Sequence, residues 1–411
     1  MKAWDRAVDE GRLKLYGRTF VGVYLAVAVA WCWLSVGGID RDGGSLGYDF
    51  ITFYAAAKLA LAGHAADAFD PEKIFAAQQA AVPGNTSVFL WHYPPTFHLL
   101  VLPLGLLPYF GAFFAFLAAT VPPYLLLVRR ISDHPLAFLL AVAFPAAFVN
   151  ASHGQNAFLN TALFGLGLIL LDRRPVLAGA LIGMLAYKPH LAVLLPFVLA
   201  AAGYWRSFAA AAATALAFCA LSTLVFGLGY WAAWYGNLAV VARVLETGLL
   251  PWHKMPSLFA MASLLGAPTK AAYALQAAVA LPVALATVWA WRRPGPLDLK
   301  VALVAAATAM MSPYLFDYDL LLMAIPTAIL AERMRRRAEP EGAMLLVLAA
   351  LAPLAGPALA GATRIQLMPL AIVAVWLLTW RALARERLSQ RKRPTRPEAE
   401  RVRGALYPDM A

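Results

Sequence analysis

Apolar runs long enough to cross a lipid bilayer alternate along the chain with short polar or basic segments. A transmembrane helix needs about 20 apolar residues, and fewer where the helix is packed or tilted. Nine runs fit this description, at 19–36, 176–187, 190–203, 207–227, 269–291, 298–311, 320–333, 343–360 and 366–380. The pattern therefore predicts an all-α polytopic membrane protein.

The stretch 96–171 is apolar throughout but is broken by several prolines. The loop before it should lie outside and Arg173-Arg174 after it inside, so it must contain an odd number of crossings. Three crossings in this stretch, together with the nine runs above, give about 12 crossings overall. If Arg129-Arg130 lie inside, Gln155 is an outer-face residue. If they lie outside, Gln155 falls within a long broken helix.

Basic residues gather at the ends of apolar runs, at Arg173-Arg174, Arg292-Arg293, 333–337 and 381–403. Positive charge beside a membrane span marks the cytoplasmic side. Both termini are therefore expected in the cytoplasm of a multi-pass plasma (inner) membrane protein, and the first span is expected to be an uncleaved helix. Residues 1–380 are expected to form one transmembrane domain and 381–411 a basic cytoplasmic tail.

Composition supports the membrane assignment. Hydrophobic residues make up 62% of the chain, charged residues 14%, and the mean hydropathy is +0.67, whereas a soluble domain has roughly 25% charged residues. The net charge of +12 does not indicate nucleic-acid binding, because the basic residues flank spans. Cys32 and Cys219 both lie in apolar runs, so neither a disulfide framework nor a metal site is implied.

Two long loops fall on the outer side in this topology. The first, 37–93, should contain short helices at Phe50–Ala62 and, after Pro71, at Glu72–Ala81. The second, 229–268, should carry short helices in the headgroup plane with an interfacial aromatic belt. We assign to that belt Tyr230, Trp231, Trp234, Tyr235 and Trp252.

Asp49, in the segment Gly47-Tyr48-Asp49-Phe50, is the first candidate site residue. A carboxylate at the outer membrane surface suits catalysis on a lipid-linked substrate. The alternative is that Asp49 caps the helix beginning at Phe50, since Asp is a favoured N-cap residue.

Lys188 and His190 form a second polar segment, at the outer turn between two short apolar runs. A lysine within a membrane span costs ~3 kcal/mol and usually faces a cavity with a partner. It fits a phosphate counter-ion, and a neutral replacement should then weaken donor binding while leaving folding intact. The alternative is a lysine that extends to the membrane surface from a helix end.

Three further polar segments lie between apolar runs. Gln155 and Asn156 can hydrogen-bond a sugar or join helices. Asp317-Tyr318-Asp319 resembles a metal-binding DxD motif, but two solvated carboxylates of a turn are the alternative. His253-Lys254, beside Trp252, could contact a lipid phosphate. All of these segments fall on one face in the predicted topology, which favours a single outer-face site.

These segments, in this order, resemble the GT-C glycosyltransferases, and most closely glycosyltransferase family 87. The matching pieces are Tyr48-Asp49-Phe50 with "FYAAAKLALAGHAADAFDPEKI", then "WHYPPTF", "GQN", "AYKPHLAVLLP", "WHKMPSLFA" and "SPYLFDYDLLLMAIP". Some relatives carry histidine where this chain has Tyr318 or Asp319. The resemblance implies a GT-C type bundle of about 12 transmembrane helices with two outer loops bearing interfacial helices.

The resemblance also implies an activity. Members transfer a hexose or pentose from a polyprenyl-phosphate donor to a lipid-linked, glycolipid or polysaccharide acceptor on the outer (periplasmic) face, and mannose is the expected sugar. It implies that Asp49 is the general base of an inverting reaction, with Lys188 or His253-Lys254 stabilising the leaving polyprenyl phosphate. No metal or other cofactor is then required. Trp91, Tyr93 and Trp252 could stack on sugar rings or the polyprenyl chain.

Two other classes of protein compete with this interpretation. A multispan transporter or flippase of lipid-linked saccharides should place ionisable residues near the membrane midplane in repeated halves, and no repeat is visible. A non-catalytic membrane scaffold would not need Asp49.

Overall fold

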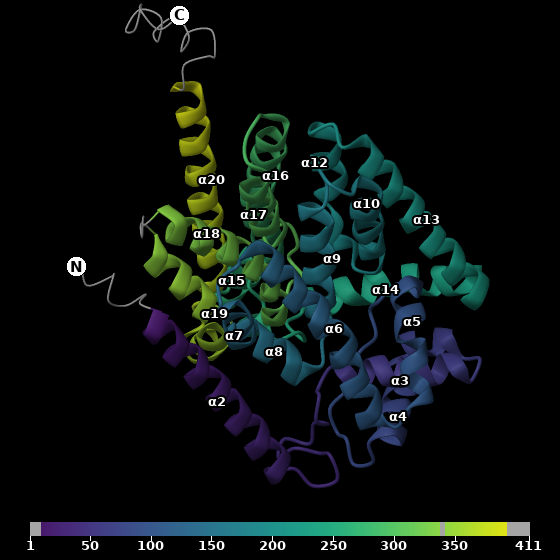
Figure 1. The fold of residues 1–411 in the computed structure, drawn as a ribbon. Helices are drawn as coiled ribbons and strands as arrows, with labels where there is room; N and C mark the ends of the chain where they lie inside the picture. The colour runs from purple at the N-terminus through teal and green to yellow at the C-terminus, as the bar shows by residue number, and fades with distance from the viewer. Residues whose placement is uncertain (1–9, 338–341, 393–411) are drawn as a thin grey trace, which may run out of the picture.

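The computed structural model describes residues 10–337 and 342–392, and this part of the chain is almost entirely helical (Figure 1). No strand forms within these ranges beyond two isolated bridges that Ile39 makes with Val36 and Ser45. The all-α prediction is confirmed.

Six helices of the described residues are long and apolar enough to cross a membrane. Their lipid-facing sides carry exposed apolar side chains such as Leu25 and Leu224, which suit a hydrocarbon surrounding. The total of about 12 crossings stays a prediction. The six are α2 (Glu10–Leu34), α6 (Tyr109–Ile131), α13 (Trp205–Phe226), α16 (Thr269–Arg292), α19 (Ala343–Thr363) and α20 (Met368–Lys392).

Shorter helices pack between and beside these six. Many begin with a proline, which suits the first helical turn because a backbone N–H at that position would have no partner within the helix. The α-helices are α3 (Phe50–Leu61), α4 (Pro71–Ala81), α5 (Pro95–Val101), α7 (Ala137–Ala143), α8 (Pro145–His153), α9 (Ala157–Ile169), α10 (Pro175–Gly183), α11 (Pro189–Ala192), α12 (Leu195–Ala201), α14 (Leu228–Glu246), α15 (Leu258–Leu264), α17 (Leu297–Thr308) and α18 (Ala324–Arg337). The 3₁₀ helices are η1 (Ala65–Phe69), η2 (Leu102–Leu106), η3 (Met184–Tyr187), η4 (Trp252–Lys254) and η5 (Asp317–Met323).

The centre of the bundle is α17, in which residues 301–307 have no exposed surface. It packs against α9, α16, α18 and α20. A helix surrounded on all sides needs no polar face, which explains why its sequence is apolar at nearly every position.

Both helices predicted in the first loop are present, as α3 and α4. Asp70 caps α4, because its Oδ1 accepts hydrogen bonds from the backbone N–H groups of Glu72 (2.9 Å) and Lys73 (3.2 Å). Figure 1 shows α3, α4 and α5 grouped together, away from the C-terminal end of α20.

The second loop differs from its prediction at Tyr230. The first part of this loop, to Glu246, is one helix, α14. Tyr230 in this helix is only 2% exposed because its hydroxyl lies between Trp91 and His98. Tyr230 is therefore a core residue and not part of an interfacial belt, whereas Tyr235 is 74% exposed.

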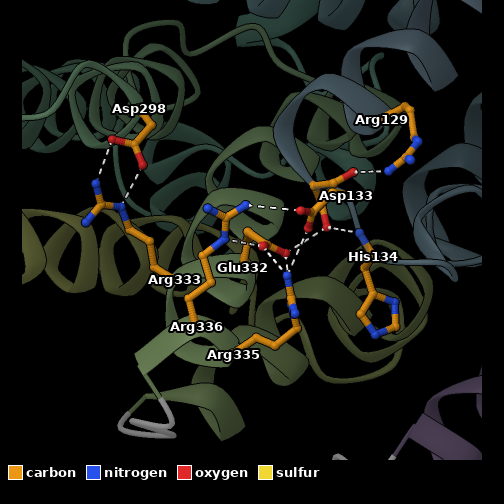
Figure 2. A network of polar contacts seen from close by, with 9 residues as sticks. Arg129, Asp133, His134, Asp298, Glu332, Arg333, Arg335 and Arg336 are labelled. Atoms are coloured by element: carbon orange, nitrogen blue, oxygen red, sulfur yellow. Dashed lines mark hydrogen bonds and ion pairs between the residues drawn. The ribbon is translucent and has the colours of Figure 1, made fainter.

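The breaks within 96–171 are now located. Helix α6 continues through Pro122-Pro123, and the chain breaks at Ser132–Leu136, at Phe144 and at Gly154. Ser132, just after Arg129-Arg130, donates a hydrogen bond to Glu332 of α18 (2.8 Å). Figure 2 shows Glu332 within the arginine cluster of α18, with Arg129 and Asp133 close by. Arg129-Arg130 thus lie at the same end of the bundle as 333–337, and α7 and α8 lead from there to Gln155. Which membrane face each end occupies stays a prediction.

Helix α20 passes the predicted tail boundary at Trp380 and continues to Lys392, extending beyond its neighbours in Figure 1. The remainder of the predicted tail, 393–411, lies outside the described residues.

Candidate active site

Asp49 does not cap α3. Its backbone is helical (φ −62°, ψ −22°) and its side chain accepts no hydrogen bond from the first turn. Instead, Oδ2 accepts a hydrogen bond of 2.8 Å from Nε2 of Gln155. Within the described part of the chain Oδ1 has no partner. The capping interpretation is therefore wrong, and one carboxylate oxygen stays available to a substrate.

Gly154 brings Gln155 to Asp49. It ends α8 in the left-handed conformation (φ +59°), and a Cβ there would lie 2.5 Å from Cβ of Phe50. Glycine adopts this backbone without the strain of a side chain and permits the close approach. The residue after Gly154 and the residue before Phe50 consequently meet.

Gln155 is itself held in place by its neighbours. Its Oε1 accepts hydrogen bonds from the hydroxyl of Tyr93 (3.1 Å) and from the backbone N–H of Asn156 (3.2 Å). These bonds fix the amide so that its N–H group points at Asp49.

Lys188 lies in a second polar group, directly beside the first. It is 4% exposed, and its Nζ donates to Oδ1 of Asp319 (2.6 Å) and to Oδ1 of Asn156 (3.0 Å). The ring centre of Tyr318 lies 5.6 Å from Nζ, within range of a cation–π contact. The interpretation of Lys188 as a surface-reaching lysine is wrong.

Gln155 and Asn156 are consecutive, so the two groups form one continuous series: Asp49, Gln155, Asn156, Lys188 and Asp319. The predicted convergence of these polar segments is present in the structure. The acidic residues of η5 are not a solvated turn, because Asp317 and Asp319 are 3% and 4% exposed.

Asp317 lies near the same site. Burial raises the pKa of its carboxyl to about 6, although the charges of His153 and Lys254 and the backbone N–H of Tyr318 oppose that shift. The charge of Asp49 raises it further. Asp317 thus lies among His153, Lys254 and Asp49.

The two candidate histidines occupy different places. The ring of His190 lies 6.5 Å from that of Tyr314, and the ring of His92 lies 6.4 Å from the same tyrosine. His253 instead packs against α19 near Gly361, and its carbonyl accepts a hydrogen bond of 2.8 Å from Gln366. No hydrogen bond joins it to Asp49 or Asp319 among the described residues.

His153 and Tyr314 are site residues absent from our sequence-based set, and Tyr93, expected only to stack on a sugar or the polyprenyl chain, instead donates a hydrogen bond to Gln155. Burial, followed by the charges of Asp49 and Asp319, raises the pKa of Tyr314 above its ordinary value, so this ring lies near both carboxylates. These residues lie in polar segments that the sequence shows, but no sequence signal separates their side chains from other aromatic residues nearby. Trp91, in contrast, is 1% exposed and donates to Tyr230, so it cannot stack on a sugar.

The DxD-like segment raises the question of which side chains could hold a metal ion. Within 10–337 and 342–392, no three His, Cys, Asp or Glu side chains are grouped to hold one. Lys188 also neutralises Asp319, the second acidic residue of the DxD-like segment.

The sequence model of glycosyltransferase family 87 matches residues 91–313, slightly more than half of the chain. The chain belongs to glycosyltransferase family 87. The match includes Gln155, Asn156, Lys188 and the His253-Lys254 segment but ends before Asp317 and begins after Asp49. No curated protein and no solved structure matched the chain.

Membership of family 87 makes the protein a glycosyltransferase, and its apolar helices make it a membrane protein. The transporter and scaffold alternatives are thereby set aside. Asp49 and Asp319 lie outside the matched region, but the structure joins both to residues within it.

Proposed function

We propose that this family 87 glycosyltransferase transfers a sugar, with mannose expected, from a polyprenyl-phosphate donor to a lipid-linked or polysaccharide acceptor on the outer membrane face. The observation that supports this proposal is the hydrogen-bonded series from Asp49 to Lys188. It places a carboxylate that can accept a proton beside an ammonium group that can face a phosphate.

Asp49 is the general base in this proposal. Its Oδ1 accepts the proton of the acceptor hydroxyl while that oxygen attacks the anomeric carbon. The bond from the anomeric carbon to the donor phosphate breaks, and polyprenyl phosphate leaves with the bonding electrons. Attack on the face opposite the phosphate inverts the anomeric configuration.

Lys188 supplies positive charge to the leaving phosphate. An ammonium group has three N–H donors, and two of them are committed to Asp319 and Asn156. The third can reach a phosphate oxygen, where charge develops as the bond breaks. Lys254, near Asp317, adds a second positive charge. Phosphate is already a good leaving group, so the proposed reaction does not need a metal.

The test is release of polyprenyl phosphate by purified protein given polyprenyl-phosphate mannose, glucose or arabinofuranose. Replacement Asp49→Asn keeps the hydrogen bond from Gln155 but removes the proton acceptor, so turnover should fall about 100- to 10,000-fold. The matched control is Asp42→Asn, which removes the same charge from an exposed position of the same loop and should leave turnover unchanged.

Asp49→Ala should unfold only slightly below Asp49→Asn, because it loses the hydrogen bond from Gln155 but no helix cap. If Asp49→Asn retained most of its turnover, Asp49 would not be the base, and Asp317 or Asp319 would be the next candidates.

A further inference from the structure

A pocket lies between α18 and α20, at the arginine-rich end of the bundle. Four arginines line it in two pairs, each pair one helical turn apart: Arg333 with Arg337 on α18, and Arg381 with Arg385 on α20. Residues four apart lie on the same side of a helix, so the two pairs face one another across the pocket.

Carboxylates neutralise only part of this charge. Arg333 is bidentate to Asp298, with N···O distances of 2.6 and 2.8 Å, as Figure 2 shows. Arg333 and Arg337 both also contact Oε1 of Glu386. Arg381 is exposed and has no side-chain partner among the described residues.

Apart from the four arginines and Glu386, the pocket lining is apolar. Leu330 precedes Arg333 on α18, and Leu378 precedes Arg381 on α20, so both helices change from apolar to basic at the same level. Such a change marks the boundary between hydrocarbon and headgroups. The pocket therefore has an apolar part for acyl chains and a basic part for a charged headgroup.

We propose that this pocket binds the phosphate group of an anionic phospholipid. Arginine favours phosphate because its guanidinium can donate two parallel hydrogen bonds, and basic pockets between transmembrane helices bind anionic headgroups on the cytoplasmic side. Arg381 donates to the phosphate, and the acyl chains lie along Leu378, since Leu330 is only 2% exposed. The site is separate from Asp49 and does not depend on the reaction proposed there.

Native mass spectrometry can test this with protein in an uncharged detergent, titrated with phosphatidylglycerol. Replacement Arg381→Gln should weaken phosphatidylglycerol binding roughly fivefold or more. The matched control is Arg174→Gln, since Arg174 is also exposed and lies at the end of an apolar run outside the pocket. This variant should bind phosphatidylglycerol as the unmodified protein does.

Equal phosphatidylglycerol binding by the Arg381→Gln variant and the unmodified protein would overturn the proposal. Thermal unfolding with millimolar inorganic phosphate gives an independent comparison. The unmodified protein should gain no stability from inorganic phosphate. If it does gain stability, and Arg381→Gln does not, the pocket binds free phosphate and the lipid proposal is wrong.

Discussion

Lys188 and Asp319 lie 131 residues apart in the chain and form a buried ion pair. Removing one partner of such a pair leaves an uncompensated buried charge, whereas removing both does not. The structure therefore changes the expectation that a neutral residue at 188 would leave folding intact.

Replacement Lys188→Met should lower the free energy of unfolding by about 3–5 kcal/mol, because Asp319 then stays buried without its cation. The double variant Lys188→Met/Asp319→Asn should recover most of that loss but should not recover sugar transfer, since the phosphate still lacks its ammonium partner. Thermal unfolding and donor turnover of the three proteins measure the two effects separately. A double variant no more stable than Lys188→Met would show that the pair is not the source of the loss.

Asp317 should make stability depend on pH. Its folded pKa of about 6 lies above the ordinary value of 3.8, so the folded state favours the protonated carboxyl. The contribution of the Asp317 carboxyl to the free energy of unfolding is fully present below pH 3.8 and is lost as the pH rises through about 6. Asp317→Asn removes this loss while its amide oxygen can still accept from the N–H of Tyr318.

The melting temperature of Asp317→Asn should consequently exceed that of the unmodified protein by more at pH 7.5 than at pH 4.5. Asp42→Asn serves as the exposed control. A difference in melting temperature between the two proteins that did not change with pH would contradict the raised pKa of Asp317.

At the scale of helices, the meeting of α3 with the α8–α9 turn assembles the site. Gly154 permits that contact both through its positive φ and through its closeness to Phe50. Gly63 also has a positive φ (+85°), but a Cβ there would have no neighbour within 4 Å. These two glycines separate the effect of backbone conformation from the effect of close packing.

Gly154→Ala should lose more stability and more activity than Gly63→Ala. Both variants incur the left-handed penalty of roughly 1–2 kcal/mol, but only Gly154→Ala must also displace Phe50 and move Gln155 from Asp49. Melting temperature and donor turnover of the two variants test this. Equal losses of turnover would mean that the close approach does not position the site.

At the scale of the whole molecule, the arginine end and the Asp49 end are opposite ends of one bundle. The α6–α18 contact through Ser132 and Glu332 fixes the arginine end, and α8 leads from there towards Gln155. If basic clusters mark the cytoplasm, Asp49 faces outward.

Cysteine labelling tests this orientation in a protein whose Cys32 and Cys219 are replaced by alanine. An impermeant maleimide should react from outside with Ala66→Cys and Thr247→Cys, both at exposed positions of the outer loops. It should react with Arg173→Cys only after the membrane is permeabilised. The reverse pattern in intact cells would place Asp49 in the cytoplasm and overturn the proposed outer-face reaction.

The class of protein, most of the long helices and the two helices of the first loop could be predicted from the residues alone. Hydropathy acts over about 20 consecutive residues, and Pro71 and Asp70 act within one turn, so both signals are local. The sequence also identified the polar segments that converge at the site, because a polar group within an apolar run is costly and must have a partner.

Which polar groups pair with one another depends on how distant helices pack, and no local signal contains it. Gln155 and Asp49 are 106 residues apart, and their contact depends on Gly154 packing against Phe50. The sequence therefore could not distinguish a free carboxylate from a helix cap at Asp49. The burial of Trp91 and Tyr230 likewise depends on packing between distant helices, because an aromatic residue suits a membrane interface and a core equally well.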